Sequence, residues 1–486
     1  MWILSTLLGL GCPKKDIAMT TDAVEETVTL VAIERLVAQY PSWNGTTIVN
    51  EDISLDFSVH FSIEEGQLIG SMDIPVQNAF DFPLEDIIWT ETELSFVLKP
   101  PQTPKFAWAE YHFAWNDSGT LEGELQQMKQ HFPTVLSAGA KRNLNRPQTP
   151  NPPFEYSEEE FQITVQDGAS LVGTLVVPKV DLKPDDGFPL AVLITGSGPQ
   201  DRDETVFGHK PFAVIADHLA KEGIASLRLD DRGVGESTLG DENATTLTFA
   251  QDIQEVLQKI KNHDQINAQK IGLIGHSEGG LIAGIVASEN DAGIDFVVMM
   301  AGPGIVGIDL MVRQHRDMFQ ALSLSEEQLQ ELDGAYRSAL LTSPEDVDAE
   351  QQAIKALVEI QMSLAQQELD EGALQPAIDQ FRQIKQSAWF QTFLSLDPAA
   401  YFVKIQAPVL VLNGAMDIQV ASDVNVSAIE SLIKSNGNNQ VQSHILPNLN
   451  HLFQNSKTGN IAEYGVIEET IDPMVLDLIS DWILAQ

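Results

Sequence analysis

The segment from 271 to 280, Ile-Gly-Leu-Ile-Gly-His-Ser-Glu-Gly-Gly, holds the residues of this 486-residue chain best suited to covalent chemistry. A short apolar run, 271–274, leads into Gly-His-Ser-Glu-Gly at 275–279, and the apolar residues that follow are typical of a buried helix. Glycines on both sides of a serine permit the sharp strand-to-helix turn that presents its hydroxyl. The pattern predicts that Ser277 is a nucleophile. The alternative is a strand, turn and helix without chemistry.

A serine hydroxyl becomes nucleophilic when a base takes its proton and an acid orients that base. The stretch Pro408-Val-Leu-Val-Leu-Asn-Gly-Ala-Met-Asp417 predicts a buried strand with a carboxylate in the turn after it, and Ile445-Leu-Pro-Asn-Leu-Asn-His451 places an imidazole on a loop. The order nucleophile, acid, histidine along the chain fits a serine on a strand-to-helix turn. The predicted triad is Ser277, Asp417 and His451, and the alternatives are Asp423, in a predicted helix, and His444, in a predicted strand.

The anion that forms when a serine attacks a carbonyl needs two N–H donors that are already in place. Glu278 follows the nucleophile, and its backbone N–H lies at a helix N-terminus. The other donor is expected in Leu193-Ile-Thr-Gly-Ser-Gly-Pro199, where small residues let the backbone approach a substrate. We expect the oxyanion hole at Glu278 and Ser197, with Gly198 as the second candidate in this loop. A phosphate-binding loop is the alternative, but its Lys-Ser/Thr partner is missing.

A second glycine pattern bears on cofactors. Gly302-Pro-Gly-Ile-Val-Gly307 matches Gly-x-Gly-x-x-Gly after a predicted strand at 296–300. A dinucleotide site would need a second strand and an acidic residue about 20 positions further on, whereas Gln-rich helical sequence follows here. We interpret the pattern as a glycine-rich exit from the sheet. No His-Glu-x-x-His or comparable ligand spacing occurs, so neither a cofactor nor a catalytic metal is expected.

Composition excludes some partners. Asp and Glu number 70 against 28 Lys and Arg, which gives a net charge of −42. Such a surface repels phosphate backbones and anionic lipid, and this argues against a nucleic-acid-binding protein. The hydrophobic fraction of 43% allows sizeable cores. The single cysteine, Cys12, rules out an intrachain disulfide and a cysteine-based metal site.

After about residue 155, short apolar runs alternate with helical stretches. This alternation is typical of a mostly parallel sheet with helices on both faces. From Asp309 to about Ala399 the sequence is rich in Gln, Glu, Leu and Ala, without a strand signal, and predicts a helical insertion over one end of the sheet. The predicted strands are Ala191–Ile194, Ala225–Leu229, Ile271–Ile274, Phe296–Met300 and Val409–Leu412, and the predicted helices include Phe212–Lys221 and Ala250–Lys261.

The N-terminal part has a different pattern. From Ile53 to Ile63 apolar and polar residues alternate strictly, and Gln67–Ile74 returns after a Glu-Glu-Gly turn, which predicts a hairpin. Shorter runs at Glu93–Leu98 and Tyr111–Trp115 complete a small antiparallel β domain. Four prolines with polar spacers between Asn143 and Pro153 indicate a semi-rigid linker after it.

The chain begins with an apolar run that ends at Gly11-Cys12. This run is too short to span a bilayer, which needs about 20 residues, but it is typical of an export signal. A cysteine at the cleavage point resembles a bacterial lipoprotein signal, in which Cys12 would become the lipidated end of a periplasmic or outer-membrane-anchored protein. A buried N-terminal strand is the alternative.

Taken together, the motifs resemble those of bacterial α/β-hydrolases, in the secreted serine esterase group with a Gly-Ser-Gly-Pro-x-Asp-Arg-Asp signature. That signature is Gly196-Ser-Gly-Pro-Gln-Asp-Arg-Asp203 in this chain. The resemblance covers about 155–486, and the β domain resembles an accessory domain of some members. It implies an α/β-hydrolase fold with a helical cap, and hydrolysis of esters of small acyl groups. The other similar stretches are Asp230-Asp-Arg-Gly-Val-Gly-Glu-Ser237, Gly275–Gly279, Asn450-His-Leu-Phe-Gln454 and Glu463-Tyr-Gly-Val-Ile-Glu-Glu-Thr470.

Five charged residues of these stretches, Asp201, Arg202, Asp230, Asp231 and Arg232, are expected to form an ion network that braces the oxyanion loop. Direct contact with the substrate is the alternative. Such a network would preserve the shape of the loop between turnovers.

The sequence therefore predicts a serine hydrolase that cleaves a small-molecule ester through an acyl-enzyme. An acyl-peptide or peptide-amide hydrolase of the same fold and a non-catalytic surface-binding protein are the alternatives, and no oligomeric state is indicated. The predicted boundaries are a signal segment at 1–12, a β domain at 17–142, a Pro-rich linker at 143–154, and a catalytic domain at 155–486 with a helical cap at about 309–399.

Overall fold

The computed structural model divides the chain into two compact units, Met1–Asn145 with Asp370–Ala377, and Arg146–Leu369 with Ile378–Gln486. No helix in the described part of the chain is long and apolar enough to cross a membrane. The expected signal segment and Cys12 lie outside the described residues. The structure describes residues 33–48, 54–75, 79–99, 108–116, 119–127, 130–139, 145–179, 181, 183–289, 293–319, 324–364 and 371–486.

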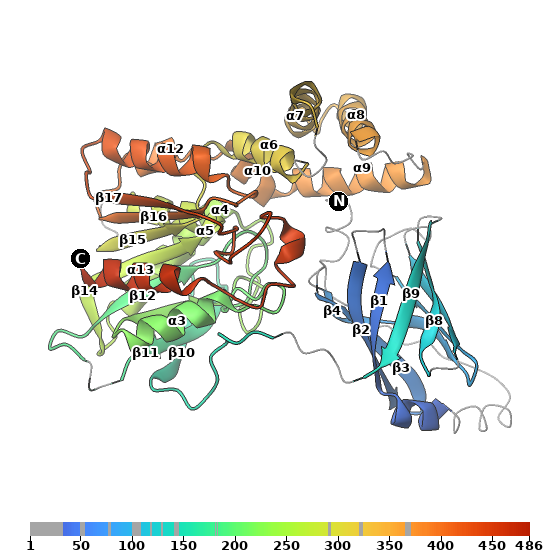
Figure 1. Ribbon diagram of the computed structural model, residues 1–486. Helices are drawn as coiled ribbons and strands as arrows, with labels where there is room; N and C mark the ends of the chain where they lie inside the picture. Colours follow the sequence, from blue (N-terminus) through green and yellow to red (C-terminus); the bar gives the residue numbers. More distant parts are fainter. Residues whose placement is uncertain are drawn as a thin grey trace. The chain divides into compact units, whose positions relative to one another are not determined.

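The first unit is built on a nine-stranded antiparallel sheet in the order β4-β3-β2-β1-β9-β8-β7-β6-β5 (Figure 1). The predicted hairpin is confirmed, since β2 (Ser54–Glu64) pairs with β3 (Gln67–Ile74). The apolar side of the alternation is buried at Phe57, Val59 and Phe61. The other strands are β1 (Ser42–Ile48), β4 (Ala79–Pro83), β5 (Glu85–Trp89), β6 (Glu93–Leu98), β7 (Ala109–Trp115), β8 (Leu121–Gln127) and β9 (Gln130–Ala138).

This sheet curves back on itself. Strands β4 and β5 stand at opposite ends of the strand order, yet only Leu84 separates them along the chain. The two edges must therefore come close together, and the concave face encloses an aromatic core. Trp43, Phe96 and Tyr111 are among its fully buried members.

The second unit is built on an eight-stranded sheet in the order β10-β11-β13-β12-β14-β15-β16-β17. The six strands β12 to β17 are parallel to one another, which confirms the predicted sheet. Strand β11 pairs antiparallel with both of its neighbours, β10 and β13. The strands are β10 (Ser157–Thr164), β11 (Ser170–Val177), β12 (Phe188–Ile194), β13 (Ala225–Leu229), β14 (Ile266–His276), β15 (Phe296–Met300), β16 (Val409–Gly414) and β17 (Val441–Leu446).

Helices cover both faces of this sheet (Figure 1). One face carries α3 (Pro211–Lys221) and α13 (Pro473–Leu484), which contact each other. The other face carries α4 (Thr246–Ile260), α5 (Glu278–Ala287) and α12 (Ser422–Ser435). Because α5 packs on both β14 and β15, all ten of its residues are buried.

Between β15 and β16 the described residues form helices and no strand. The sequence prediction of a helical segment from 309 to about 399 agrees with this content. The helices are α6 (Gly307–Met318), α7 (Glu326–Leu341), α8 (Val347–Leu364), α9 (Glu371–Gln386), α10 (Ala388–Ser395) and α11 (Ala399–Phe402).

The proline-rich segment is attached to the second unit by polar contacts. The Arg146 guanidinium donates hydrogen bonds to the carbonyl oxygens of Phe207, Gly465 and Ile467. The Gln148 side chain donates to the Ile471 carbonyl at 2.6 Å and accepts from the backbone N–H of residues 470 and 471. From Arg146 onward, the predicted linker is therefore a docked part of the second unit.

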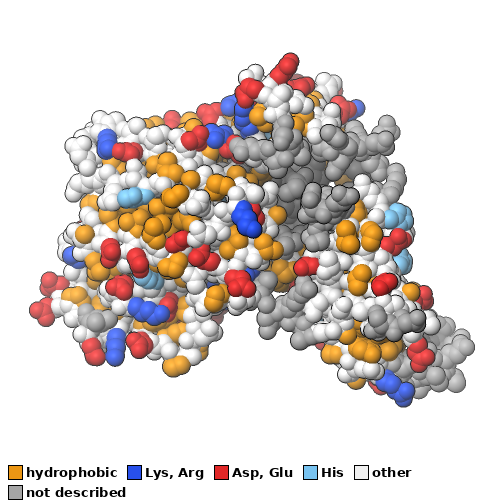
Figure 2. Space-filling model, in the orientation of Figure 1, with side chains coloured by type: hydrophobic (Ala, Val, Ile, Leu, Met, Phe, Trp, Pro, Cys, Tyr) orange, Lys and Arg blue, Asp and Glu red, His pale blue; other side chains and the backbone are white. Residues whose placement is uncertain are grey.

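Acidic side chains are dispersed over the face shown in Figure 2, with fewer basic ones between them. No extended basic area is visible on that face. This distribution matches the excess of 70 acidic over 28 basic residues in the sequence.

Candidate active site

The predicted triad residues all follow the carboxyl ends of neighbouring parallel strands. Ser277 follows β14, Asp417 follows β16 and His451 follows β17. Strands β14 to β17 are adjacent in the sheet, and their last residues are in register, with His276 opposite Met300 and Gly414 opposite Leu446. Open sheets of this kind bind ligands at that edge.

The nucleophile turn has the strained backbone that its glycines predict. Ser277 has φ +54°, in a region that residues with a side chain rarely adopt, and its N–H donates to the Met300 carbonyl at 2.8 Å. A Cβ atom on Gly275 would lie 2.0 Å from the Gly279 carbonyl oxygen, and one on Gly279 would lie 2.1 Å from the Ile194 carbonyl oxygen. Both flanking positions therefore require glycine, and Ser277 stays half-buried at the strand end.

Asp417 and His451 lie against each other. Nδ1 of His451 is 2.8 Å from Oδ2 of Asp417, and both side chains are buried. The other carboxylate oxygen of Asp417 accepts backbone N–H bonds from Gln419 at 2.8 Å and Val420 at 2.9 Å. The carboxylate thus has a fixed orientation, and it holds the imidazole with Nε2 free to serve another group.

The His451 loop lies next to the nucleophile turn. Nε2 of His276, the residue before Ser277, is 3.0 Å from the His451 carbonyl oxygen, and the two imidazole rings are 4.7 Å apart between centroids. The alternative acid and base lie elsewhere. Asp423 pairs with Arg313 on α6, and His444 contacts Gln442 on its own strand.

The oxyanion loop follows β12, as the sequence predicts. Gly196 N–H is occupied, because it donates to Oε1 of Glu204 at 2.9 Å. Among the described residues, the N–H groups of Ser197, Gly198 and Glu278 have no hydrogen-bond acceptor. Gly198 has φ +92° and open space around it, so it also supplies the turn. The available donors are therefore Glu278 and, in the loop, Ser197 or Gly198.

The loop is held in place by Asp231. Its two carboxyl oxygens accept hydrogen bonds from the Thr195 hydroxyl at 2.7 Å and from the Gln200 backbone N–H at 2.8 Å. Asp231 N–H returns a hydrogen bond to the Gln200 carbonyl. Asp231 therefore clamps both ends of the segment that carries Ser197.

The remaining residues of the expected network brace the neighbouring turns. Arg202 makes a two-point contact with Asp230, at 3.1 Å and 2.5 Å, and Arg232 makes one with Asp252, at 2.7 Å to each oxygen. Asp201, by contrast, contacts no cationic side chain among the described residues. It accepts the backbone N–H groups of residues 203 and 205, which closes a local turn.

A pocket adjoins the oxyanion loop, and both Asp231 and Glu278 line it. The pKa of Asp231 is raised to about 7 as the net result of three causes: burial raises it, the hydrogen bonds from Thr195 and Gln200 lower it, and the charges of Glu204 and Glu278 raise it. The folded chain therefore binds this proton more tightly than the unfolded chain. The stability that this proton contributes is greatest at acidic pH and is lost as the pH rises toward about 7.

Replacing Asp231 by Asn should remove this pH dependence. We compare the melting temperature of Asp231→Asn with that of the wild type at each pH. From pH 5 to pH 8 this difference should shift by about 5 °C in favour of the variant, because its amide stays neutral. Thermal melts at both pH values measure the difference. The control is Asp186→Asn, which removes an exposed carboxylate. An equal shift in the two variants would contradict the assignment.

The Glu278 side chain is a feature that the sequence did not reveal. It is buried directly behind the nucleophile, where Oε1 accepts from the Thr246 hydroxyl at 2.6 Å and from Nε1 of Trp389, on α10, at 2.9 Å. Burial raises the pKa of Glu278, and hydrogen bonds from Thr246, Trp389 and Ser197 lower it, with a net increase. The position after the nucleophile thus connects α4, α10 and the oxyanion loop.

The Gly-x-Gly-x-x-Gly pattern serves helix packing. A Cβ atom on Gly304 would lie 2.4 Å from the Asn425 carbonyl oxygen, and one on Gly307 would lie 1.8 Å from the Phe393 carbonyl oxygen. The glycines therefore allow α12 and α10 to approach the exit from β15. The described residues contain no group of His, Cys, Asp and Glu that could hold a metal ion.

A comparison with protein families identifies the family of this chain. A sequence model of the alpha/beta hydrolase fold family matches residues 191–457. Esterase EstD of Thermotoga maritima is 26% identical over 330 residues, which make up 68% of this chain and 68% of that protein.

Two solved structures illustrate the similarity of this chain to known proteins. The esterase Pf2001 of Pyrococcus furiosus is 18% identical with a TM-score of 0.39, and the match covers 68% of this chain and 91% of that one. Est1E of Butyrivibrio proteoclasticus is 16% identical with a TM-score of 0.38, over 67% and 98% of the two chains.

Proposed function

This chain belongs to the alpha/beta hydrolase fold family, and from that premise we propose that it is a serine esterase. The observation that carries the proposal is the Asp417–His451 pair at 2.8 Å, beside the strained turn of Ser277. The esterase name of the Thermotoga relative supports carboxylic esters as substrates. Esters of small acyl groups are the proposed substrates, and amide or acyl-peptide hydrolysis is the alternative activity.

The chemistry follows from the arrangement of the groups. Ser277 Oγ attacks the ester carbonyl while Nε2 of His451 takes its proton, and the Asp417 carboxylate stabilises the imidazolium through Nδ1–H. The N–H groups of Ser197 and Glu278 donate to the anionic oxygen of the tetrahedral intermediate. His451 then gives the proton to the departing alcohol. A water molecule, deprotonated by the same imidazole, releases the acid from Ser277.

We also propose that the helices between β15 and β16 act as a cap at this site. The support is the contact between α10 and the nucleophile turn, where the Trp389 indole N–H donates to the Glu278 carboxyl. Trp389 is part of an aromatic group with Phe390 and Phe393 on the same helix. An apolar surface beside the reacting serine suits the acyl part of an ester.

The proposal is tested by labelling with a fluorophosphonate, read out by intact mass. We expect one adduct on the wild type and none on Ser277→Ala, because only an activated serine attacks the phosphorus. The variant should keep its secondary structure, and a panel of esters and amides then identifies the leaving group. Absence of an adduct on the folded wild type would refute the esterase assignment and favour the non-catalytic binding protein.

A further inference from the structure

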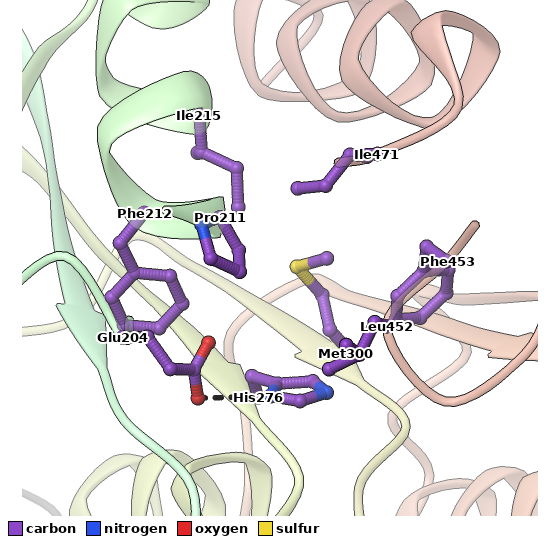
Figure 3. Close-up of a pocket in the computed structure, with 9 residues that line it drawn as sticks. All are labelled: Glu204, Pro211, Phe212, Ile215, His276, Met300, Leu452, Phe453 and Ile471. Atoms are coloured by element: carbon purple, nitrogen blue, oxygen red, sulfur yellow. Dashed lines mark hydrogen bonds and ion pairs between the residues drawn. The ribbon is translucent and has the colours of Figure 1, made fainter. Parts of the chain in front are cut away.

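A buried acid and a buried histidine face each other behind the nucleophile. Nδ1 of His276 is 2.9 Å from Oε1 of Glu204, and the two residues are 6% and 3% exposed (Figure 3). They border a small cavity, and Figure 3 shows that the other side chains around it come from Pro211, Phe212, Ile215, Met300, Leu452, Phe453 and Ile471. No other titratable side chain lines this cavity. Its apolar wall shields the pair from water.

The hydrogen bonds of His276 limit where its protons can be. Nε2 lies 3.0 Å from the His451 carbonyl oxygen, which can only accept, so Nε2 carries a hydrogen. Nδ1 faces a carboxyl oxygen that already accepts the Gly196 N–H at 2.9 Å. A second ring hydrogen on Nδ1 satisfies all of these groups, with the negative charge on Glu204.

The groups around the ring favour this charged form. Burial lowers the pKa of His276, whereas the charge and hydrogen bond of Glu204, the His451 carbonyl and the Asp417 charge raise it, with a net increase. The rings of His451 and Phe453 also lie against it. Among the described residues, the charged groups that act on this imidazole are the carboxylates of Glu204 and Asp417.

We propose that Glu204 and His276 form a charged pair that positions the catalytic machinery. The pair touches three parts of the site at once. Glu204 binds Gly196 N–H at the start of the oxyanion loop, His276 is covalently joined to Ser277, and the His276 ring binds the carbonyl of His451. This role rests on the proposed esterase function, and both residues act through others without touching the substrate.

Glu204 itself has a costly backbone conformation. Its φ is +53°, a conformation that non-glycine residues keep only where the surroundings impose it. The hydrogen bonds to Gly196 and His276 supply such surroundings. The unusual backbone conformation thus indicates that these contacts fix the position of the Glu204 carboxylate.

The chain contains a natural contrast. His209 is also buried, but its ring nitrogens face the Thr470 hydroxyl and the Tyr464 carbonyl, both at 2.9 Å, without a carboxylate. Burial and the nearby Arg146 lower its pKa to about 4, although carbonyl hydrogen bonds raise it. Without a facing acid, the buried His209 is thus expected to stay neutral.

The first test is nuclear magnetic resonance on the full chain with 15N-labelled histidine. At about pH 8.5 ordinary histidines are neutral. We expect one of the 10 histidines to keep both ring nitrogens protonated, and to lose this signature in Glu204→Gln. Finding every imidazole neutral in the wild type would overturn the proposal, and this result needs no variant to fold.

The second test measures kinetics of Glu204→Gln. We expect kcat to fall about 100-fold and the labelling rate of Ser277 to fall in parallel, with KM within about threefold, because small displacements of reacting groups have this effect. The control is Asp73→Asn, since Asp73 is an equally buried acid, at 4% side-chain exposure like Glu204, that faces His60 in the first unit.

The outcomes separate the two proposals. A wild type that takes up the fluorophosphonate while Glu204→Gln labels at an equal rate would refute the positioning role alone. A wild type that takes up no label would instead refute the esterase function. Equal losses of activity in Glu204→Gln and Asp73→Asn would also overturn the proposal, because they would reflect general destabilisation.

Discussion

Replacement of His451 by Ala is expected to lower kcat by about 10⁶-fold, with little change in KM, because the variant loses the base proposed to take the proton of Ser277. The structure supports this choice, since Nδ1 of His451 contacts Asp417 and its carbonyl contacts the residue before the nucleophile. Initial rates on a small ester and thermal melts measure the effect. The melting curve should stay close to that of the wild type.

The matched control is His444→Ala. His444 lies on the edge strand β17, where Nε2 contacts the Gln442 amide at 2.7 Å, and it has no carboxylate partner among the described residues. Its removal should change kcat less than about twofold, as for surface positions away from the chemistry. If kcat fell further in His444→Ala than in His451→Ala, His444 would be the base in place of His451.

Asp417→Asn should reduce kcat about 10⁴-fold without unfolding the protein. The two backbone N–H groups of Gln419 and Val420 both donate to Oδ1 of Asp417. They would hold the amide oxygen of Asn in that place, so the amide NH₂ would face Nδ1 of His451. The imidazole would then carry its hydrogen on Nε2, where it cannot accept the proton of Ser277.

For this prediction Asp423→Asn is the control. The Asp423 side chain is 63% exposed and pairs with Arg313, so its loss should leave kcat within about twofold. Rates for both variants on the same ester decide between the two carboxylates. A loss below about tenfold in Asp417→Asn would show that Asp417 does not orient the base.

Much of the fold could be predicted because its elements have strong local patterns. The strands at 225–229 and 296–300 appear with the predicted bounds, and the alternation at 53–63 gives β2. Strands β10 and β11 were missed. Strand β10 has six polar residues in eight, Ser-Glu-Glu-Glu-Phe-Gln-Ile-Thr, and lies at the edge of the sheet, where burial imposes little pattern.

The triad and the oxyanion loop could be proposed from the sequence because glycines and strand ends mark their positions. The side chains that support them could not be predicted in this way. Glu204 and His276 are 72 residues apart, and Thr246 and Trp389 meet Glu278 from other helices. Such contacts depend on how helices and loops pack, and an isolated Glu or Trp carries no local signal of its partner.

The anchoring of Arg146 has a consequence for the order of events during synthesis. All strand pairs of the first sheet lie between residues 42 and 138, so its hydrogen bonds can form early. Arg146 must wait for its carbonyl partners at 465 and 467, some 319 and 321 residues later. Contacts this distant in sequence close slowly. The N-terminal unit can therefore complete its sheet while the hydrolase unit is still being made, and Arg146 is anchored within the hydrolase unit only at the end.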